Sequence, residues 1–373
     1  MAGGSSRHRV PCSIITGFLG SGKTTLVNHI LKAQHGRHIA VVENEFGEVG
    51  VDAGLVEGAA GAREEIFEMS NGCVCCTVRG DLVRILRKLL ARREPFDHIL
   101  IETTGLADPA PVAQTFYMDE DLKEGLALDA VVTVVDAKHV LLHLDERKAG
   151  GAVNECLQQV AFADRLLLNK VDLVDGGEKA RVLRRLREVN GYCRIVETMQ
   201  SSVTVDDILG IEAFSLERML EKGDAFVPQS PPSHSGAEGA PCGEANCADP
   251  DCSHHGHDHA HGHDHSHYHD SSVSSVGLEF VGSVCINKVN TWLSSLLRER
   301  GPDLYRSKGI LAVEGSDHKF VFQGVHSLLT ITSSEEGIGR DWRPGEKRSN
   351  KIVFIGKHLH RTQLEADFKS CLV

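Results

Sequence analysis

Residues 16–26, Thr-Gly-Phe-Leu-Gly-Ser-Gly-Lys-Thr-Thr-Leu, match the pattern Gly-x-x-x-x-Gly-Lys-[Ser/Thr]. They lie between an apolar run and a stretch with helical apolar spacing, the strand, loop and helix context that separates a true match from chance. Gly17, Gly20 and Gly22 allow backbone conformations that other residues avoid, so consecutive N–H groups can point at phosphate oxygens beside a helix N-terminus. The loop therefore predicts a nucleoside triphosphate as the ligand.

Two side chains of this loop carry the expected chemistry. We expect the Lys23 ammonium to contact the β- and γ-phosphates and the Thr24 hydroxyl to bind Mg²⁺, an ion that keeps most of its water. Thr25 follows as a helix residue rather than a second ligand. The predicted nucleotide-binding residues of the loop are Gly17, Phe18, Leu19, Gly20, Ser21, Gly22, Lys23, Thr24 and Thr25.

A tetrapeptide further along the chain indicates which base is bound. Asn169-Lys170-Val171-Asp172 follows the apolar run 165–168, which has the pattern of a buried strand. An aspartate at this position can accept hydrogen bonds from the N1–H and the exocyclic amine of guanine, and adenine lacks that pair of donors. In a chain that already carries a phosphate loop, the order Asn-Lys-x-Asp favours GTP over ATP.

An acidic residue lies between these two motifs. The strand-like run 96–101 leads into Glu102-Thr103-Thr104-Gly105. At the C-terminal edge of a parallel sheet, Glu102 can hold Mg²⁺ through water and Gly105 can approach the γ-phosphate. The alternative for Glu102 is a helix-capping or surface carboxylate. We predict Lys23, Thr24 and Glu102 as the catalytic set, with slow intrinsic turnover because no glutamine or arginine finger can be assigned from the sequence.

Three thiols lie within four residues in Asn71-Gly72-Cys73-Val74-Cys75-Cys76-Thr77. Thiolates bind Zn²⁺ at about 2.3 Å, but a tetrahedral ion needs a fourth ligand, so the predicted site is open or shared. The alternative is a set of buried small hydrophobic residues. The preceding Asn-Gly turn and the helix expected from about residue 80 favour metal. The remaining cysteines in apolar patterns are predicted core thiols: Cys12, Cys156, Cys193, Cys285 and Cys371.

A histidine-rich tract forms a second candidate metal region. Its imidazoles alternate with small and polar residues, follow Cys242, Cys247 and Cys252, and suit Zn²⁺, Ni²⁺, Co²⁺ or Cu²⁺. A flexible tract imposes no geometry, so we expect it to collect or buffer ions with modest selectivity. The alternative is a disordered spacer that binds metal incidentally. The tract comprises His254, His255, His257, His259, His261, His263, His265, His267 and His269.

Composition sets limits on location and partners. The 373 residues contain neither a run of about 20 apolar residues nor a signal-peptide pattern, so we expect a soluble, cytoplasmic protein without a membrane partner. A formal net charge of −12 argues against nucleic acid as a partner. Eleven cysteines without a signal peptide favour thiols and metal over a disulfide framework.

Strand and helix patterns alternate from residue 10 to about residue 226. This alternation predicts an α/β fold, a P-loop NTPase domain (1–226) with a mostly parallel sheet and helices on both faces. The apolar runs lie at 38–42, 97–101, 129–135, 165–168 and 193–196, and the helical stretches at 80–92, 153–161 and 177–189.

The rest of the chain changes character. Residues 227–272 are rich in Pro, Ser, Gly, His and Asp and cannot bury a core, which predicts a disordered linker. Residues 273–373 predict a smaller α+β domain. Its expected elements are strands at 276–286, 309–314, 319–325 and 351–356, an amphipathic helix through 289–297 ending at Gly301-Pro302, and a last helix with a capping box at Thr362-Gln363-Leu364-Glu365.

Taken together, the motifs resemble the CobW-type family of P-loop GTPases, which includes the zinc-regulated GTPase metalloprotein activators. The likeness covers nearly the whole chain outside the linker. It is carried by residues 16–25, 43–48, 72–76, 101–109 and 169–172, and in the second domain by 305–309, 322–326 and 353–356.

The resemblance implies a metallochaperone that hydrolyses GTP, holds zinc, cobalt or nickel at the Cys-x-Cys-Cys segment and transfers the ion to a client apoprotein. By the same analogy Glu43 and Glu48 could join the metal site, the alternative being solvated loop carboxylates. Family members that serve methionine aminopeptidase carry a Cys-Pro-Glu-Leu-Val-Pro segment that residues 1–12 lack. Two other hypotheses remain open: a metal-storage protein with a passive nucleotide fold, and a GTP-dependent switch without metal cargo.

The order of the motifs also suggests how nucleotide and metal could be coupled. The segments 43–48 and 73–76 both lie between the phosphate loop and Glu102, where nucleotide-sensitive switch segments are expected. Ordering of these segments by γ-phosphate and Mg²⁺ could bring the thiols together.

Overall fold

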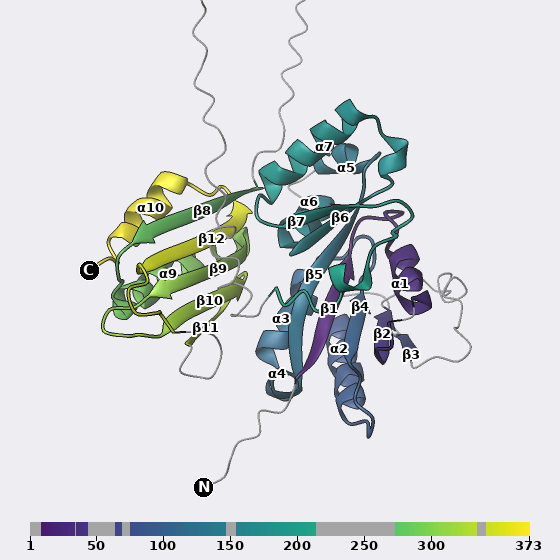
Figure 1. Cartoon of the computed structure of the whole chain (residues 1–373), viewed down its shortest axis with the longest axis horizontal. Helices are drawn as coiled ribbons and strands as arrows, with labels where there is room; N and C mark the ends of the chain where they lie inside the picture. Colours follow the sequence, from purple (N-terminus) through teal and green to yellow (C-terminus); the bar gives the residue numbers. More distant parts are fainter. Residues whose placement is uncertain are drawn as a thin grey trace, which may run out of the picture.

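The computed structural model describes residues 9–33, 35–43, 64–68, 75–146, 154–213, 273–333 and 341–373. These residues form two sheets, drawn in purple to teal and in green to yellow (Figure 1). No helix in these ranges is both long and apolar enough to cross a membrane.

The first sheet has seven strands in the order β3-β2-β4-β1-β5-β6-β7, paired in parallel. Its order reverses around β1, which lies between β4 and β5. In open parallel sheets, ligands bind at the carboxyl ends of the strands at such a switch point. The strands are β1 (Val10–Thr16), β2 (Ile39–Glu43), β3 (Glu64–Glu68), β4 (His98–Glu102), β5 (Leu126–Asp136), β6 (Arg165–Asn169) and β7 (Arg194–Glu197).

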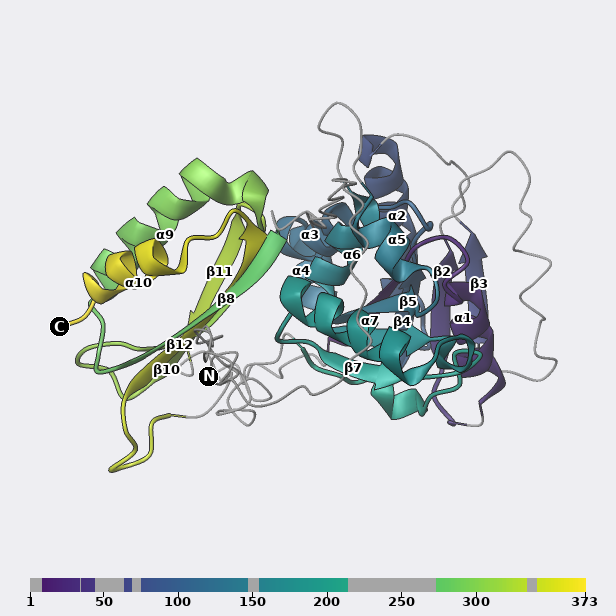
Figure 2. The ribbon, with the colours of Figure 1, turned by 90° about the horizontal axis from the view of Figure 1, so that it is seen from above.

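Helices cover both faces of this sheet (Figures 1 and 2). Because side chains alternate along a strand, Ile14 packs into the core that contains Leu86 of α2, while Ile15 packs into the core that contains Leu26 of α1. The helices are α1 (Lys23–Lys32), α2 (Cys75–Leu90), α3 (Ala110–Met118), α4 (Glu120–Gly125), α5 (Val140–Leu144), α6 (Glu155–Phe162) and α7 (Gly176–Val189), with short 3₁₀ turns η2 (Val171–Leu173) and η3 (Val205–Asp207).

The second sheet is antiparallel, with the order β11-β10-β9-β12-β8. Two helices, α9 and α10, lie together on one of its faces (Figure 2). Phe322, Phe354 and Phe368 are fully buried in the core between them and the sheet. The elements are β8 (Val273–Val281), α9 (Ile286–Arg300), η5 (Gly301–Asp303), β9 (Leu304–Ala312), β10 (Lys319–Val325), β11 (Leu328–Ser333), β12 (Ser349–Lys357) and α10 (Arg361–Lys369).

The predicted fold class is confirmed, and the differences have local causes. The strand expected at 276–286 ends at Val281, because the chain turns at Gly282 with a φ of 111°. The predicted capping box at 362–365 is wrong. Helix α10 begins at Arg361, and its N-cap residue His360 makes no side-chain capping bond in the described structure. The elements missed from sequence are β3, β11, α3, α4 and α5.

Other expectations about these regions have mixed outcomes. Four of the predicted core thiols, Cys12, Cys156, Cys193 and Cys371, are buried. Cys285 is only half-buried, at the N-cap of α9. The expected linker, 227–272, lies outside the described residues, so the predicted domain boundaries remain predictions.

A buried carboxylate joins the two sheets. Asp164, just after α6, accepts hydrogen bonds from Arg306 (2.9 Å) and Lys308 (2.7 Å), both on β9 of the other sheet. Arg306 also donates to the carbonyl oxygen of Phe162, the last residue of α6 (3.0 Å). Burial alone would raise the pKa of Asp164, but the two cations lower it to about 2. The carboxylate is therefore charged and fully paired at the contact between the sheets.

Removing Arg306 should leave the Asp164 carboxylate buried with one cation fewer. We expect Arg306→Met to lower the free energy of unfolding in urea by roughly 3–5 kcal/mol at neutral pH. Because the folded-state pKa lies below the ordinary value, the pair stabilises fully above pH of about 4 and loses its contribution as the pH falls toward about 2. The difference between parent and variant should therefore shrink on acidification.

The matched control is Arg298→Met, which removes an arginine whose side chain is 78% exposed. A change below about 1 kcal/mol for Arg306→Met, equal to that of the control, would contradict a stabilising role for this contact.

Candidate nucleotide and metal site

The phosphate loop connects β1 to α1 in the predicted way. Gly17, Gly20 and Gly22 have φ values of 144°, 71° and 109°, which other residues rarely adopt, as the sequence predicted. The Lys23 ammonium donates to the carbonyl oxygens of Gly17 (2.8 Å) and Phe18 (3.2 Å), so it lies over the loop. The Ser21 hydroxyl is buried in the same loop without a hydrogen-bond partner among the described residues. A phosphate group would suit both donors.

The loop also packs against the segment predicted to bind the base. A Cβ added at Gly22 would clash with the Asn169 amide and the Ser201 hydroxyl. Asn169 donates to the carbonyl oxygen of Ser21 (2.9 Å) and to the Ser201 hydroxyl (3.0 Å), and Ser201 in turn donates to the carbonyl oxygen of Gly22 (2.9 Å). Asn169 therefore fixes the base-binding segment to the phosphate loop. Ser201 was not identified from sequence.

The residues predicted to hold Mg²⁺ lie together. The Thr24 hydroxyl, at the start of α1, donates to Glu102 Oε1 at the end of β4 across 3.2 Å. Glu102 is only 8% exposed, so it is not the surface carboxylate of the alternative hypothesis. Glu43 ends the neighbouring strand β2 and is the register partner of Glu102. The Thr24 hydroxyl and the Glu102 carboxylate fit Mg²⁺, which prefers hydroxyl, carboxylate and phosphate oxygens.

The segment after β4 packs tightly on the phosphate loop. A Cβ added at Gly105 would lie 2.6 Å from the side chain and 2.8 Å from the backbone nitrogen of Leu19. Only glycine allows this approach. On its other side, the carboxamide of Gln159 donates to the carbonyl oxygens of Gly105 (3.1 Å) and Ala107 (3.0 Å). The loop predicted to approach the γ-phosphate is thus fixed from two sides.

The other residues predicted to bind the base are Lys170 and Asp172. Asp172 is exposed within η2, where it can meet a base. Lys170 has a φ of 61° and donates to Asp136 Oδ2 across 2.7 Å. Burial raises the pKa of Asp136, but hydrogen bonds from Lys170 and His139 outweigh it and leave that pKa below its ordinary value. Asp136 was missed because it lies 34 residues from Lys170 in the chain.

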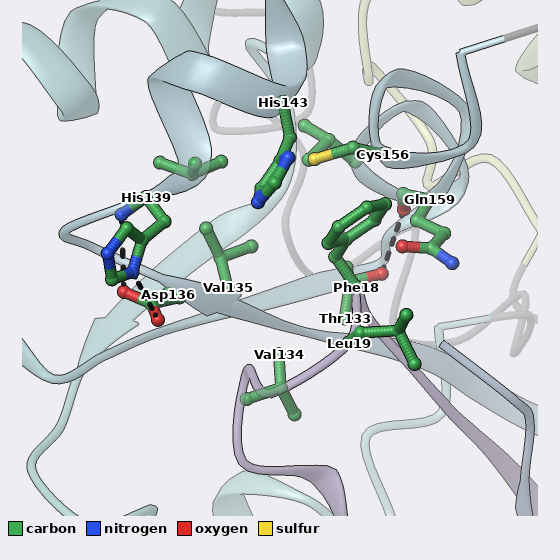
Figure 3. A pocket seen from close by; sticks show the side chains of 12 residues that line it. Phe18, Leu19, Thr133, Val134, Val135, Asp136, His139, His143, Cys156 and Gln159 are labelled. Carbon is green, nitrogen blue, oxygen red and sulfur yellow. Dashed lines mark hydrogen bonds and ion pairs between the residues drawn. The ribbon is translucent and has the colours of Figure 1, made fainter. Parts of the chain in front are cut away.

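A pocket of about 420 Å³, including its open mouth, lies beside the phosphate loop (Figure 3). The Phe18 ring packs against the imidazole of His143, with 4.0 Å between ring centroids. Gln159 lines the same pocket, and its Oε1 atom is buried without a partner in the described ranges. The pocket walls come from the phosphate loop, the end of β5, α5 and α6.

The predicted metal ligands lie mostly outside the described residues. The structure describes the backbone of Cys75 and Cys76, which begin α2. Within the described ranges, no group of three or more His, Cys, Asp or Glu side chains could hold a metal ion. His326 lies near Phe162 and Tyr305, with ring centroids 5.4 and 5.6 Å away. Cys73, Glu48 and the tract His254–His269 fall outside the description, so the metal site remains a prediction.

Comparison with known proteins adds independent information. The model of the CobW/HypB/UreG nucleotide-binding domain matches residues 11–197, and that of the cobalamin synthesis protein CobW C-terminal domain matches residues 273–372. The chain is 33% identical to zinc-regulated GTPase metalloprotein activator 1 of Schizosaccharomyces pombe, over 96% of this chain and 84% of the relative. It is 32% identical to the zinc chaperone YjiA of Escherichia coli, over 96% and 98%. The crystal structure of zinc-bound YjiA GTPase from E. coli has a TM-score of 0.69 at 28% identity, covering 98% of this chain and all of that chain (100%).

The hydrogen bond between Lys170 and Asp136 should contribute to nucleotide affinity. We expect Asp136→Ala to weaken binding of GDP and of a non-hydrolysable GTP analogue equally, by about tenfold, because Lys170 loses the partner that orients it. Fluorescence titration with labelled nucleotides measures both affinities. The control is Glu197→Gln, which removes an exposed partner at the same 2.7 Å distance from Lys179. Unchanged affinity in Asp136→Ala would show that Lys170 needs no such support.

Proposed function

The chain belongs to the CobW/HypB/UreG family of P-loop GTPases, and on that basis we propose that it is a metallochaperone. In this proposal Cys73, Cys75 and Cys76 bind zinc or a similar divalent ion, and GTP hydrolysis controls its transfer to a client metalloprotein. Two names among its relatives support the cargo: a zinc-regulated GTPase metalloprotein activator and a zinc chaperone.

The observation that carries the proposal is the topology around the thiols. Strands β3 and β4 both run parallel to β2, and α2 connects them. A crossover helix runs antiparallel to the strands it joins, so it begins at their carboxyl edge. The first residues of α2 are Cys75 and Cys76, and the same edge carries Thr24 and Glu102. A metal bound by these thiols would lie at the nucleotide edge of the sheet.

The chemistry of this position suits a cysteine metal site. The first turn of a helix carries unpaired N–H groups and a partial positive charge, which favour the thiolate over the thiol. Metal binding requires the thiolate, so this location promotes it. Glu43 ends β2 at the same edge and, with Glu48, is our candidate for completing the coordination.

The nucleotide roles follow from the residues already described. We propose that Lys23 binds the β- and γ-phosphates and that Asp172 accepts from guanine. Thr24 directly, and Glu102 through water, would hold Mg²⁺. When bound, this ion would neutralise charge on the phosphate oxygens. The hydrolysing unit would be residues 1–226, followed by the linker 227–272 and the second domain 273–373, in accord with the two matched ranges.

Zinc titration separates the two predicted metal regions. Replacing Cys73, Cys75 and Cys76 with serine should weaken the tightest zinc site by more than about 100-fold while leaving GTP affinity unchanged, because thiolates are direct ligands and the phosphate loop does not need them. Deleting residues 254–269 should remove only weak sites. Competition with a chromogenic zinc chelator measures both effects.

The control is Cys285→Ser, which removes a half-buried thiol from the second domain. Loss of the tight site on deletion of 254–269 would instead assign the tight zinc site to the linker. Tight zinc binding that survives the triple serine variant would contradict the proposed site directly.

A further inference from the structure

Gln159 makes an unusual contact for a residue in the middle of a packed helix. Its side chain is 1% exposed on α6, and its amide nitrogen donates to two backbone carbonyl oxygens of the loop after β4, those of Gly105 and Ala107. Only the nitrogen end of a carboxamide can face two carbonyl oxygens, so the orientation of the side chain follows from its chemistry. The backbone of the same residue is anchored on β5, because Thr133 donates to its carbonyl oxygen across 2.8 Å.

The loop that Gln159 holds is also in direct contact with the phosphate loop. It begins at Thr103, which is buried, with its backbone nitrogen bonded to the carbonyl oxygen of Ile15 (2.9 Å). Two residues later, Gly105 approaches the backbone nitrogen of Leu19 so closely that no Cβ fits. Gly105 therefore contacts both Leu19 and Gln159, and its position beside the phosphate loop depends on both contacts.

A second buried carboxamide, that of Asn190, has the hydrogen bonds expected of a purely structural residue. Asn190, at the end of α7, donates to the carbonyl oxygens of Val160, Ala161 and Ala163. Its own oxygen accepts from the backbone nitrogens of Tyr192 and Cys193, so both ends of the group are bonded.

Gln159 differs from Asn190 in the bonding of its oxygen and in the segment that its nitrogen contacts. Its oxygen, in contrast to that of Asn190, is buried without a partner in the described ranges, and the residue lines the pocket beside the phosphate loop. A group retained only for packing would rarely leave a buried acceptor unbonded. The amide nitrogen of Gln159 contacts the loop after β4, whereas that of Asn190 contacts the end of α6 and the residue after it.

We propose that Gln159 is a positioning residue for GTP hydrolysis, which holds the Gly105–Ala107 loop where that loop can respond to the γ-phosphate. The inference rests on the proposed placement of the γ-phosphate opposite Gly105. GDP has no γ-phosphate, so the contribution of Gln159 should be confined to GTP and to the hydrolytic step.

Gln159→Met tests this role, because methionine keeps the length of the side chain and removes the donors. We expect kcat for GTP to fall about 10- to 100-fold, since small displacements of a positioning group cost this much. Affinity for a non-hydrolysable GTP analogue should fall as well, while affinity for GDP stays at the parental value. Single-turnover hydrolysis and nucleotide titration provide these numbers.

Asn190→Leu is the matched control, because it removes a buried carboxamide whose partners are backbone groups outside the loop after β4. It should lower the melting temperature and leave the ratio of GTP-analogue to GDP affinity unchanged. Parallel loss of GDP and GTP-analogue affinity in Gln159→Met would identify a merely structural residue and overturn the inference. Parental kcat in that variant would overturn it too, whereas absence of turnover in the parent would overturn the proposed function instead.

Gln159→Glu gives a readout that packing alone cannot produce. An ionised carboxylate would face two carbonyl oxygens without a proton to donate, while the protonated acid can donate one hydrogen bond. Burial raises the pKa of such a carboxyl group, so the acid form becomes populated as the pH falls. Turnover of Gln159→Glu, expressed relative to the parent at each pH, should therefore rise on acidification. A relative rate that stays constant while the variant remains folded would contradict the hydrogen-bonding role.

Discussion

The arrangement of the site depends on how closely the phosphate loop touches its neighbours. At Gly17 the loop meets the carbonyl oxygen of Val134 on β5, at Gly22 it meets Asn169, and Leu19 meets Gly105. Each contact is too close for a Cβ, so each requires glycine. The segment 169–172 and the loop after β4 thus both pack against the phosphate loop. In the proposed assignment, base recognition and the response to the γ-phosphate therefore share the phosphate loop as a common support.

The same contacts continue toward the second sheet. Gln159 joins the loop after β4 to α6, and α6 ends at Phe162, whose carbonyl oxygen accepts from Arg306 of β9. Two residues later, Asp164 forms buried ion pairs with Arg306 and Lys308. Helix α6 therefore contacts both the loop beside the phosphate loop and the second sheet.

The contiguous motifs could be predicted from the sequence, whereas contacts between residues far apart in the chain could not. The phosphate loop, Glu102 and the Asn-Lys-x-Asp segment are contiguous motifs, and their placement at one sheet edge follows from the parallel topology. Asp136, Gln159 and Ser201 act through partners 34, 54 and 32 residues away, which no local pattern encodes. Strand β3 was missed because Glu-Glu-Ile-Phe-Glu is polar and owes its strand form to pairing with β2. The metal ligands remain predictions.

In the proposed function, nucleotide controls metal affinity, and zinc titration in two nucleotide states tests this claim most directly. If γ-phosphate and Mg²⁺ order the segment with Cys73, Cys75 and Cys76, zinc should bind more tightly with a non-hydrolysable GTP analogue than with GDP. By reciprocity, zinc should tighten analogue binding by the same factor, about 5- to 150-fold for couplings of about 1–3 kcal/mol. Equal zinc affinity in the two states would contradict the claim and leave a GTPase whose metal binding is independent of its nucleotide.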